Sequence, residues 1–160
     1  MKELKNFLNA VLRGLSGISF LAMVVLTCWQ VFTRYILKNP STWSEELVSY
    51  LFAWASLMGA VIVTGERGHM NIPILVERLS LRGRKAVNCF CGLIAFLFSA
   101  VILVYGGIQI SNLAMGQMTS SLGVPVGIFY LVLPICGFLN MIYTGMDMIN
   151  MIKGREGEKE

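Results

Sequence analysis

Charged side chains are scarce in this 160-residue sequence, and those present are gathered in a few short stretches. Asp, Glu, Lys and Arg make up 14% of the residues, whereas soluble domains carry about 25%. Mean hydropathy is +0.68, so water is a poor solvent for the chain. The length leaves no room for an additional soluble domain. We therefore expect one membrane domain over residues 1–160.

Histidines and paired cysteines are equally rare, which weighs against redox chemistry. A membrane haem protein needs axial ligands such as histidine pairs, and the sequence has one histidine, His69. A membrane thiol–disulfide oxidoreductase needs exposed, paired thiols. Cys89 and Cys91 are two positions apart and project about 200° apart on a helix, which makes a disulfide between them implausible. Cys28 and Cys136 fall deep in apolar runs.

No acidic residue lies in the middle of an apolar run. The acids nearest to such runs are at their rims: Glu45, Glu46, Glu66 and Asp147. A stand-alone exporter that exchanges protons for substrate needs a carboxylate inside the membrane. This class and the oxidoreductase remain the alternatives, and both are disfavoured. We expect no catalytic residue, cofactor, metal or nucleic acid on this chain.

Long uncharged runs are what the sequence does have. Gly14–Thr33 and Leu47–Gly65 are each long enough for one helical crossing, while Ala86–Met146 is long enough for two. The turn-forming stretch Gly116–Pro125 divides the third run. Backbone amides in lipid must bond within their own segment, which selects helices. The prediction is an all-α membrane protein with four transmembrane helices at about residues 14–36, 44–65, 87–114 and 126–148.

Basic residues predict the orientation of these four spans. Of the 13 Lys and Arg residues, all but Arg34 and Lys38 lie before span one, between spans two and three, or after span four. These three regions share one side of the membrane. The positive-inside rule places them, and both termini, in the cytoplasm.

The first outer connection carries several candidate residues. Thr42 and Glu45 have the spacing of a capping box at the start of span two. Trp43 falls at the depth of the lipid headgroups, where indole rings concentrate. An ordinary helix start explains these residues. Alternatively, Glu45 or Glu46 pairs with Arg34 at the end of span one, or faces a partner subunit.

The inner connection between spans two and three predicts a short amphipathic helix at about residues 71–80. Asn71 can cap it, and Pro73 suits its first turn. One face is apolar, through Ile72, Leu75, Val76 and Leu79. The helix lies either in the headgroup plane or against the spans. Four basic residues in this region are candidates for contact with phospholipids: Arg78, Arg82, Arg84 and Lys85.

Small and amide side chains inside the spans predict close helix packing. Small residues recur four positions apart at Ala55/Gly59, Ala60/Thr64, Gly107/Ser111 and Gly123/Gly127. Amides occur at Asn88, Gln109, Asn112 and Asn140. Hydrogen bonds between helices are their expected role, in preference to a substrate path, because no ionisable group accompanies them.

An ordered set of motifs resembles one known family over nearly the whole chain. The motifs are Trp29–Tyr35, Trp43–Glu46, Leu51–Trp54, Gly59–Ala60, Arg67, His69–Ile72, Ser121–Pro125, Tyr130 and Pro134–Gly137. Together they resemble the small (Q-type) membrane subunit of tripartite ATP-independent periplasmic (TRAP) transporters of the bacterial inner membrane.

The resemblance implies a non-enzymatic role in secondary transport. In this family a periplasmic binding protein delivers an organic acid, such as a C4-dicarboxylate, a sugar acid or sialic acid. A large multi-span permease subunit binds sodium and substrate and moves as an elevator. The small subunit is a scaffold for the large one and does not itself bind sodium. The substrate and the helices that contact the large subunit do not follow from the sequence.

The resemblance also suggests which residues matter. Arg34, Trp43, Glu45 and Glu46 lie on the periplasmic side, where they brace the fold, touch the large subunit or dock the binding protein; bracing is favoured. Arg67 and His69 match a basic residue and a histidine that follow span two in the family.

Overall fold

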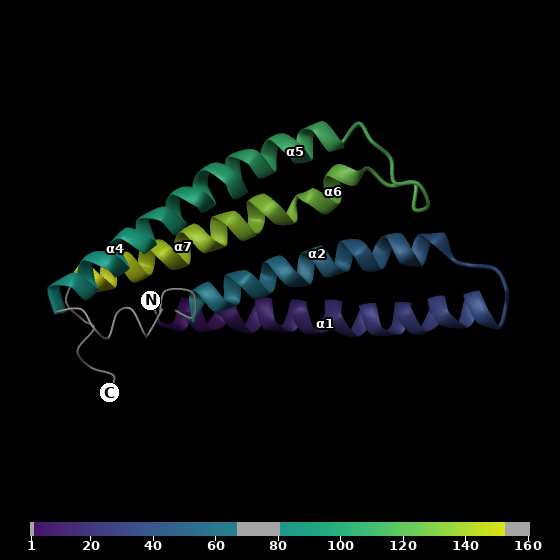
Figure 1. Cartoon of the computed structure of the whole chain (residues 1–160), viewed down its shortest axis with the longest axis horizontal. Coiled ribbons are helices and arrows are strands. Elements are labelled where there is room, and N and C mark those ends of the chain that lie inside the picture. Colours follow the sequence, from purple (N-terminus) through teal and green to yellow (C-terminus); the bar gives the residue numbers. More distant parts are fainter. Residues whose placement is uncertain (1, 67–80, 153–160) are drawn as a thin grey trace.

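The computed structural model describes residues 2–66 and 81–152, and Figure 1 shows their arrangement. The first and second membrane spans are each one continuous helix. The third and fourth spans are each divided into several consecutive helices. Their bounds are α1 (Lys2–Tyr35), α2 (Thr42–Gly65), α4 (Leu81–Phe98), the π-helix η1 (Ser99–Gly106), α5 (Gly107–Ala114), α6 (Val126–Tyr130) and α7 (Val132–Ile152).

Within the described residues, four stretches of helix are long and apolar enough to cross a membrane: Lys5–Tyr35, Thr42–Gly65, Val87–Ala114 and Val126–Ile149. The predicted all-α, four-span architecture is therefore confirmed. The start of α1, the end of α2, the start of α4 and the end of α7 lie at one end of the molecule, termed here the inner end (Figure 1). The α1–α2 and α5–α6 connections lie at the opposite, outer end.

Helix α1 begins well before the predicted boundary at residue 14. It starts at Lys2 and contains 34 residues, which corresponds to about 51 Å against a hydrocarbon core of about 30 Å. Nothing between Lys2 and Arg13 interrupts a helix, and Leu8 and Leu12 extend its packing face into this segment. The uncharged run marks the lipid-embedded part of the helix, not its start.

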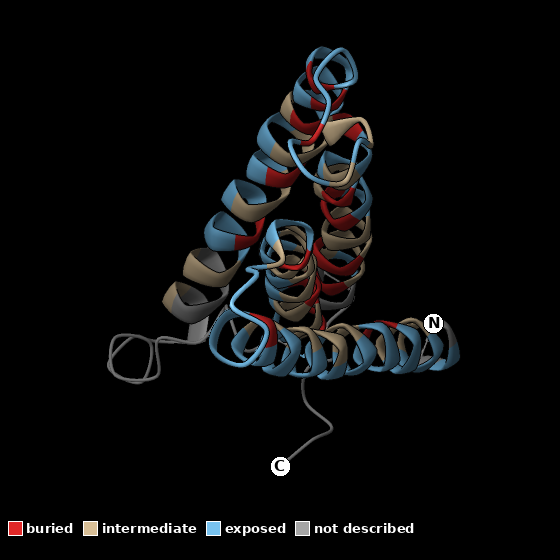
Figure 2. Cartoon of the chain, turned by 90° about the vertical axis from the view of Figure 1, so that its right-hand side faces the viewer, coloured by how far each residue is buried: buried red, intermediate tan, exposed pale blue. Residues whose placement is uncertain are grey.

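The helices form an open row instead of a closed bundle. Helix α1 packs on α2, α2 packs on α7, and α7 packs on α4 and η1. Figure 2 shows that buried residues occupy only narrow strips of each helix. The buried apolar core is small and comprises Leu12, Met58, Val61, Val132, Cys136 and Tyr143. A row leaves both of its faces open, so most of the apolar surface is available to lipid or to another protein.

Glycines bring the third and fourth spans into close contact. A Cβ atom added at Gly107 would lie 2.9 Å from the Cβ of Leu133, and one at Gly137 would lie 2.6 Å from the Cβ of Leu103. Gly127 faces the backbone of Ser111 just as closely. The predicted close approach is thus confirmed for Gly107/Ser111. By contrast, no atom lies within 4 Å of a Cβ added at Gly59, so Ala55/Gly59 forms no such contact in the chain.

The fourth span is broken between α6 and α7. Pro134 has no N–H to donate to the carbonyl of residue 130, and its ring crowds that carbonyl. The helix is accordingly interrupted at Leu131. The nearby carbonyl oxygen of Phe129 instead accepts a hydrogen bond from the Trp54 indole N–H on α2, at 2.9 Å. This bond ties α2 to the fourth span at the point where its own helical bonding is interrupted.

The predicted capping box at the start of α2 is wrong. The residue before the helix is Ser41, and no side-chain hydrogen bond caps the helix there. Ser44 instead donates from its hydroxyl to the carbonyl oxygen of Ser41, at 2.9 Å, and the two hydroxyls are in contact. Because the helix begins at Thr42, Glu45 is in the first turn and its carboxylate extends toward α1.

Candidate functional site

At the outer end, Arg34 and Glu45 form the predicted ion pair. The guanidinium Nη2 lies 3.8 Å from the Glu45 carboxylate, joining the end of α1 to the start of α2. The Arg34 and Glu45 side chains are 58% and 66% exposed. Exposed pairs of this length contribute little to stability because water and salt screen them. The pair marks where two helices meet without holding them firmly.

Glu46 makes the more specific contact at the outer end. Its two carboxylate oxygens accept hydrogen bonds from the backbone N–H groups of Ser120 and Ser121, at 3.1 and 2.9 Å. These serines belong to the connection between α5 and α6, which is folded back on itself by the Thr119–Val124 backbone bond. Glu46 thereby links the first helical hairpin to the second. Trp43, three residues before Glu46 in the first turn of α2, is 42% exposed.

One turn below Glu46, aromatic side chains extend this link into the membrane. The rings of Tyr50 and Phe129 stack with centroids 3.9 Å apart and planes 6° apart. Trp54 follows one turn later and donates to the Phe129 carbonyl. Glu46, Tyr50 and Trp54 are four residues apart, so all three project from the same face of α2 toward the fourth span.

The inner end carries a cluster that the sequence analysis did not predict, here called the inner clasp. It joins residues of α1, the end of α2 and α7: Lys5, Asn9, Arg13, Glu66, Tyr143 and Asp147. Lys5 Nζ lies 3.4 Å from the carboxylate of Asp147, whose side chain is 3% exposed. The Tyr143 hydroxyl donates to Asn9 Oδ1 at 2.7 Å. Arg13 pairs with Glu66.

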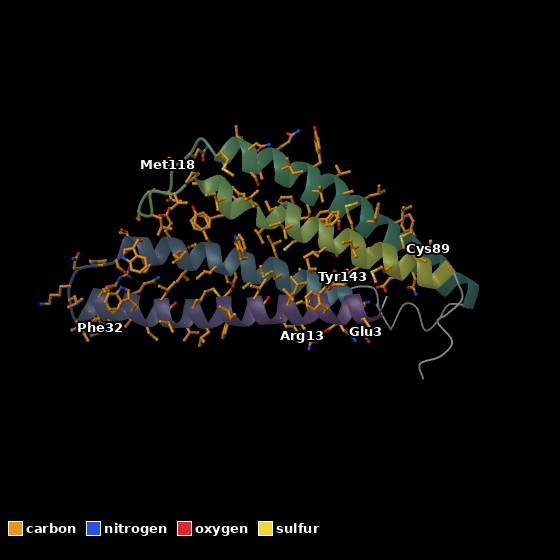
Figure 3. All side chains as sticks on the ribbon, turned by 180° about the vertical axis from the view of Figure 1, so that it is seen from behind. Glu3, Arg13, Phe32, Cys89, Met118 and Tyr143 are labelled. Atoms are coloured by element: carbon orange, nitrogen blue, oxygen red, sulfur yellow. The ribbon has the colours of Figure 1, made fainter. Side chains whose placement is uncertain are left out.

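The spacing of the inner clasp follows helix geometry. Lys5, Asn9 and Arg13 recur every four residues on α1, as do Tyr143 and Asp147 on α7, so each set shares one helix face. Figure 3 shows Tyr143 and Arg13 together at one end, with Phe32 and Met118 at the other. From the sequence, Lys5 and Arg13 indicate only the orientation of the four spans in the membrane. Their four-residue spacing was the available signal for a shared face.

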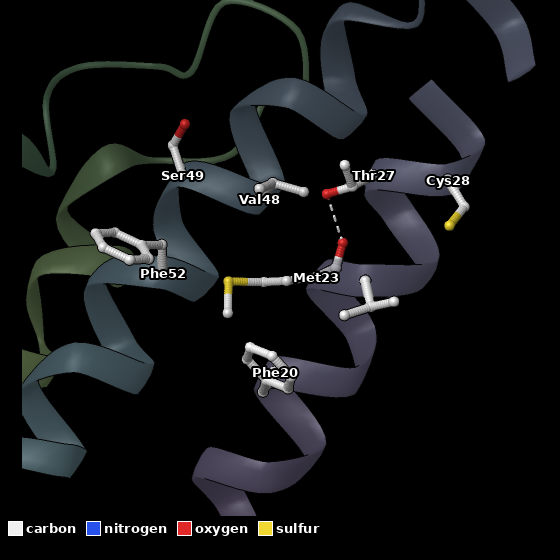
Figure 4. Close-up of a pocket in the computed structure, with 8 residues that line it drawn as sticks. Phe20, Met23, Thr27, Cys28, Val48, Ser49 and Phe52 are labelled. Atoms are coloured by element: carbon white, nitrogen blue, oxygen red, sulfur yellow. Dashed lines mark hydrogen bonds between the residues drawn. The ribbon is translucent and has the colours of Figure 1, made fainter. Parts of the chain in front are cut away.

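An open groove separates α1 from α2 near their outer halves. It has a volume of about 570 Å³, and Figure 4 shows Phe20 and Met23 on α1 facing Val48 and Phe52 on α2. Its hydroxyl groups are satisfied by their own helices: Thr27 donates to the carbonyl of residue 23, and Ser49 donates to that of residue 45. The groove therefore presents an apolar surface.

The four amides inside the spans have different environments, and the Oδ1 of Asn88 is buried without a hydrogen-bond partner among the described residues. Asn140 donates to the Ser99 hydroxyl at 2.7 Å, which confirms its predicted role between helices. Gln109 and Asn112 are exposed and form no side-chain hydrogen bond within the part of the chain that the structure describes. The prediction of hydrogen bonds between helices is therefore not confirmed for these two amides among the helices of this chain. They lie on the outer face of α5, away from α7.

The structure does not describe the side chains of several residues that the sequence singles out. Arg67, His69, Arg78 and the amphipathic segment 71–80 lie outside the described residues. Arg82, Arg84 and Lys85 lie in the first turns of α4, where only the backbone is described. Of the cysteines, Cys28, Cys89 and Cys91 are exposed, Cys136 is buried, and all four are free thiols. Within residues 2–66 and 81–152, His, Cys, Asp and Glu side chains form no group suited to a metal ion.

Comparison with known proteins identifies the family. Over 106 residues the chain is 27% identical to the sialic acid TRAP transporter small permease protein SiaQ of Vibrio cholerae, a match covering 66% of this chain and 61% of SiaQ. It is 25% identical over 151 residues to the sialic acid TRAP transporter permease protein SiaT of Haemophilus influenzae, covering 94% of this chain but 24% of SiaT. It is 28% identical over 102 residues to the C4-dicarboxylate TRAP transporter small permease protein DctQ of Vibrio cholerae, covering 64% and 41%.

The matched parts of SiaQ and SiaT are less than two thirds of those proteins' own lengths. The family model described as the DctQ component of tripartite ATP-independent periplasmic transporters matches residues 23–154. This range includes all four membrane-spanning helices except the first part of α1. The chain therefore belongs to the DctQ-component family, the small permease subunits of TRAP transporters, and is a multi-pass protein of the inner membrane.

Proposed function

We propose that this small permease subunit is a static scaffold for a large, elevator-type TRAP permease subunit. The complex performs sodium-coupled uptake of an organic acid that a periplasmic binding protein delivers. The open row of four helices carries this proposal, because it leaves apolar faces that a single chain does not bury. A scaffold needs such faces, whereas a chain that encloses its own substrate path needs polar groups within it.

Similarity to SiaT supports an intimate association with a larger polypeptide. In SiaT, a protein named as a permease, the region similar to this chain makes up 24% of a longer sequence. Joining in one polypeptide keeps two parts together at a fixed ratio. We infer that the present chain associates non-covalently with a comparable large subunit, which provides the sodium and substrate sites.

The relatives support a class of substrate but not one compound. SiaQ is named for sialic acid and DctQ for C4-dicarboxylates, and this chain is similarly related to both, at 27% and 28% identity. Both substrates are carboxylates. Small subunits related to this extent thus work with different organic acids, which fits a subunit that does not select the substrate. We infer that selection belongs to the binding protein and the large subunit.

The orientation of the scaffold follows from its charges. We propose that the inner end faces the cytoplasm, because the basic residues concentrate in the first part of α1, between α2 and the third span, and after α7. Arg78, Arg82, Arg84 and Lys85 would then meet anionic phospholipid headgroups. Labelling of single cysteines placed at Ser121 and at Lys2 with a membrane-impermeant maleimide tests this. Whole cells should label at Ser121 and not at Lys2; the reverse pattern contradicts the orientation.

Reconstitution tests the scaffold role directly. Vesicles should contain this chain alone, the large subunit alone, or both, with the binding protein and a radiolabelled organic acid outside. Uptake is expected only when both membrane subunits are present and the sodium gradient points inward. Concentrative uptake by this chain alone contradicts the proposal. Replacement of all four cysteines by serine should leave uptake unchanged, and loss of uptake would favour thiol chemistry instead.

A further inference from the structure

The outer face of the third span carries three polar side chains that form no hydrogen bond with the residues that the structure describes. Gln109 and Asn112 are three residues apart and share one face of α5, and Tyr105 lies one turn earlier, at the end of η1. Tyr105 is 63% exposed, and the two amides are also exposed. None of the three side chains has a hydrogen-bond partner among the described residues. We call these three residues the α5 polar stripe.

Helix α5 separates its residues clearly by character. Gly107, Ser111 and Ala114 are buried against the fourth span. These three residues have small or no side chains, and the Ser111 hydroxyl donates a hydrogen bond to the carbonyl of residue 107, at 2.7 Å. The face that packs on the fourth span therefore has no polar side chain without a partner. The α5 polar stripe lies on the opposite side. Beside it, Gly106, Ile110 and Leu113 complete an open recess of about 570 Å³ with Gln109 and Asn112.

Two of the three side chains, Tyr105 and Gln109, lie at the depth of the hydrocarbon core, whereas Asn112 is about 17 Å from its middle at about 1.5 Å per residue and lies at the headgroup boundary. The middle of the span Val87–Ala114 falls between Ala100 and Val101. At about 1.5 Å per residue, Tyr105 lies about 7 Å and Gln109 about 13 Å from the middle of the membrane. The hydrocarbon half-thickness is about 15 Å. Both side chains therefore face acyl chains, which offer no hydrogen bonds, and tilting the helix brings them closer to the middle.

The α1–α2 groove provides a contrast within the same molecule. Its hydroxyls bond to their own backbone, so lipid chains can cover it without leaving a polar group unsatisfied. The side chains of the α5 polar stripe do not bond to their own backbone in this way, because Gln and Tyr side chains extend away from their own helix. Polar side chains in membranes characteristically hydrogen-bond across to another helix.

We propose that the α5 polar stripe and its recess bind a transmembrane helix of the large permease subunit, through hydrogen-bonding side chains on that helix. This inference rests on the proposed function and specifies which face of this chain contacts the large permease subunit. The third span is at one edge of the row of helices, so its outer face is not covered by α1 or α2.

Photocrosslinking in the intact complex tests the assignment. p-Benzoylphenylalanine in place of Leu113 lies in the recess without removing a polar residue, since Leu113 is 75% exposed. The matched control replaces Ile18, 68% exposed on α1. After co-expression with the large subunit and irradiation of membranes, the Leu113 position should yield at least about tenfold more adduct with the large subunit than the Ile18 position.

A second measurement uses Tyr105→Phe, Gln109→Leu and Asn112→Leu combined. Loss of the hydrogen bonds that these side chains make to the partner helix should lower recovery of the large subunit on the tagged small subunit on the order of tenfold. Thr27→Val with Ser49→Ala in the groove is the control and should leave recovery unchanged. If the wild-type subunits fail to co-purify, the proposed function itself is contradicted. If they co-purify but the Leu113 adduct contains only lipid or a second copy of this chain, and the triple variant recovers normally, the α5 assignment is wrong.

Discussion

The two ends of the helical row are held together in different ways. At the inner end, Asp147 is almost fully buried and Lys5 reaches it from α1. At the outer end, Arg34 and Glu45 form their pair in an exposed position, and the specific contact is made by Glu46 with two backbone amides. A buried charge that loses its partner is costly, whereas an exposed pair is screened. The stability of the scaffold should therefore depend much more on the inner clasp.

Removing the Asp147 carboxylate should give the largest effect. Asp147→Ala leaves Lys5 without its carboxylate partner, and we expect a loss of about 2–3 kcal/mol, below the range for a fully buried pair because Lys5 keeps some access to water. In a background with Cys28, Cys89 and Cys91 replaced by alanine, only the buried Cys136 remains to react with a thiol-reactive dye on unfolding. The Tm measured in this way should fall by about 5–10 °C.

Two further variants show whether the pairing is responsible. Lys5→Met alone should also destabilise, while the double variant should recover part of the loss, since neither charge is then left without the other. Glu3→Gln, which removes an exposed acid on the same helix, is the control and should leave the Tm unchanged. Equal losses in the single and double variants would show that the Lys5–Asp147 contact is not what stabilises this end.

The joint between α2 and the broken fourth span should give an intermediate effect. Trp54→Phe keeps most of the apolar contact but removes the N–H that satisfies the Phe129 carbonyl. We expect a loss of about 1 kcal/mol, because the part-buried Phe129 carbonyl is left without this partner. Trp43→Phe is the matched control because Trp43 is 42% exposed. Equal Tm values for the two variants would contradict a structural role for the Trp54 bond.

At the outer end, Glu46 should matter more than its neighbour Glu45. Glu46→Ala removes both acceptors of the Ser120 and Ser121 amides, with an expected loss of about 1 kcal/mol. Hydrogen exchange at these two amides provides the direct measurement and should accelerate clearly in this variant. Glu45→Ala is the control, and its exchange at Ser120 and Ser121 should match the wild type. Acceleration in both variants would mean that the connection is held by something other than the Glu46 carboxylate.

The sequence was sufficient to predict those features that depend on one helix or on neighbours in the chain. Uncharged runs predicted four spans, and the short connection between the first two made a pair between Arg34 and either Glu45 or Glu46 one of the alternatives, of which the structure shows Arg34 with Glu45. In the inner clasp, the Lys5–Asp147 and Asn9–Tyr143 contacts join residues more than 130 positions apart, and nothing local indicates that α7 lies near the start of α1. The Trp54 bond likewise requires both the helix break near Pro134 and the knowledge that α2 is its neighbour.

The predicted capping box failed for a local reason. Thr42 and Glu45 have the right spacing, but the chain enters the helix one residue earlier, with Ser41 as the flanking residue. A shift of one residue moves Glu45 from reaching back to its own backbone to reaching across to Arg34. Patterns at helix ends often hold to within one or two residues, and here that interval decides which partner the carboxylate meets.

Arg34→Gln should give the smallest effect and thereby sharpens the contrast between the ends. The pair spans 3.8 Å between two side chains that are each more than half exposed, so its contribution should be at most about 0.5 kcal/mol and decline further with salt. The Tm in the dye assay should stay within about 2 °C of the wild type, and co-purification with the large subunit should be unchanged. A larger fall in Tm would mean that the outer end is braced by charge after all. A loss of co-purification at unchanged Tm would instead show that Arg34 contacts the large subunit. Only a contact outside this chain could then account for the lost association.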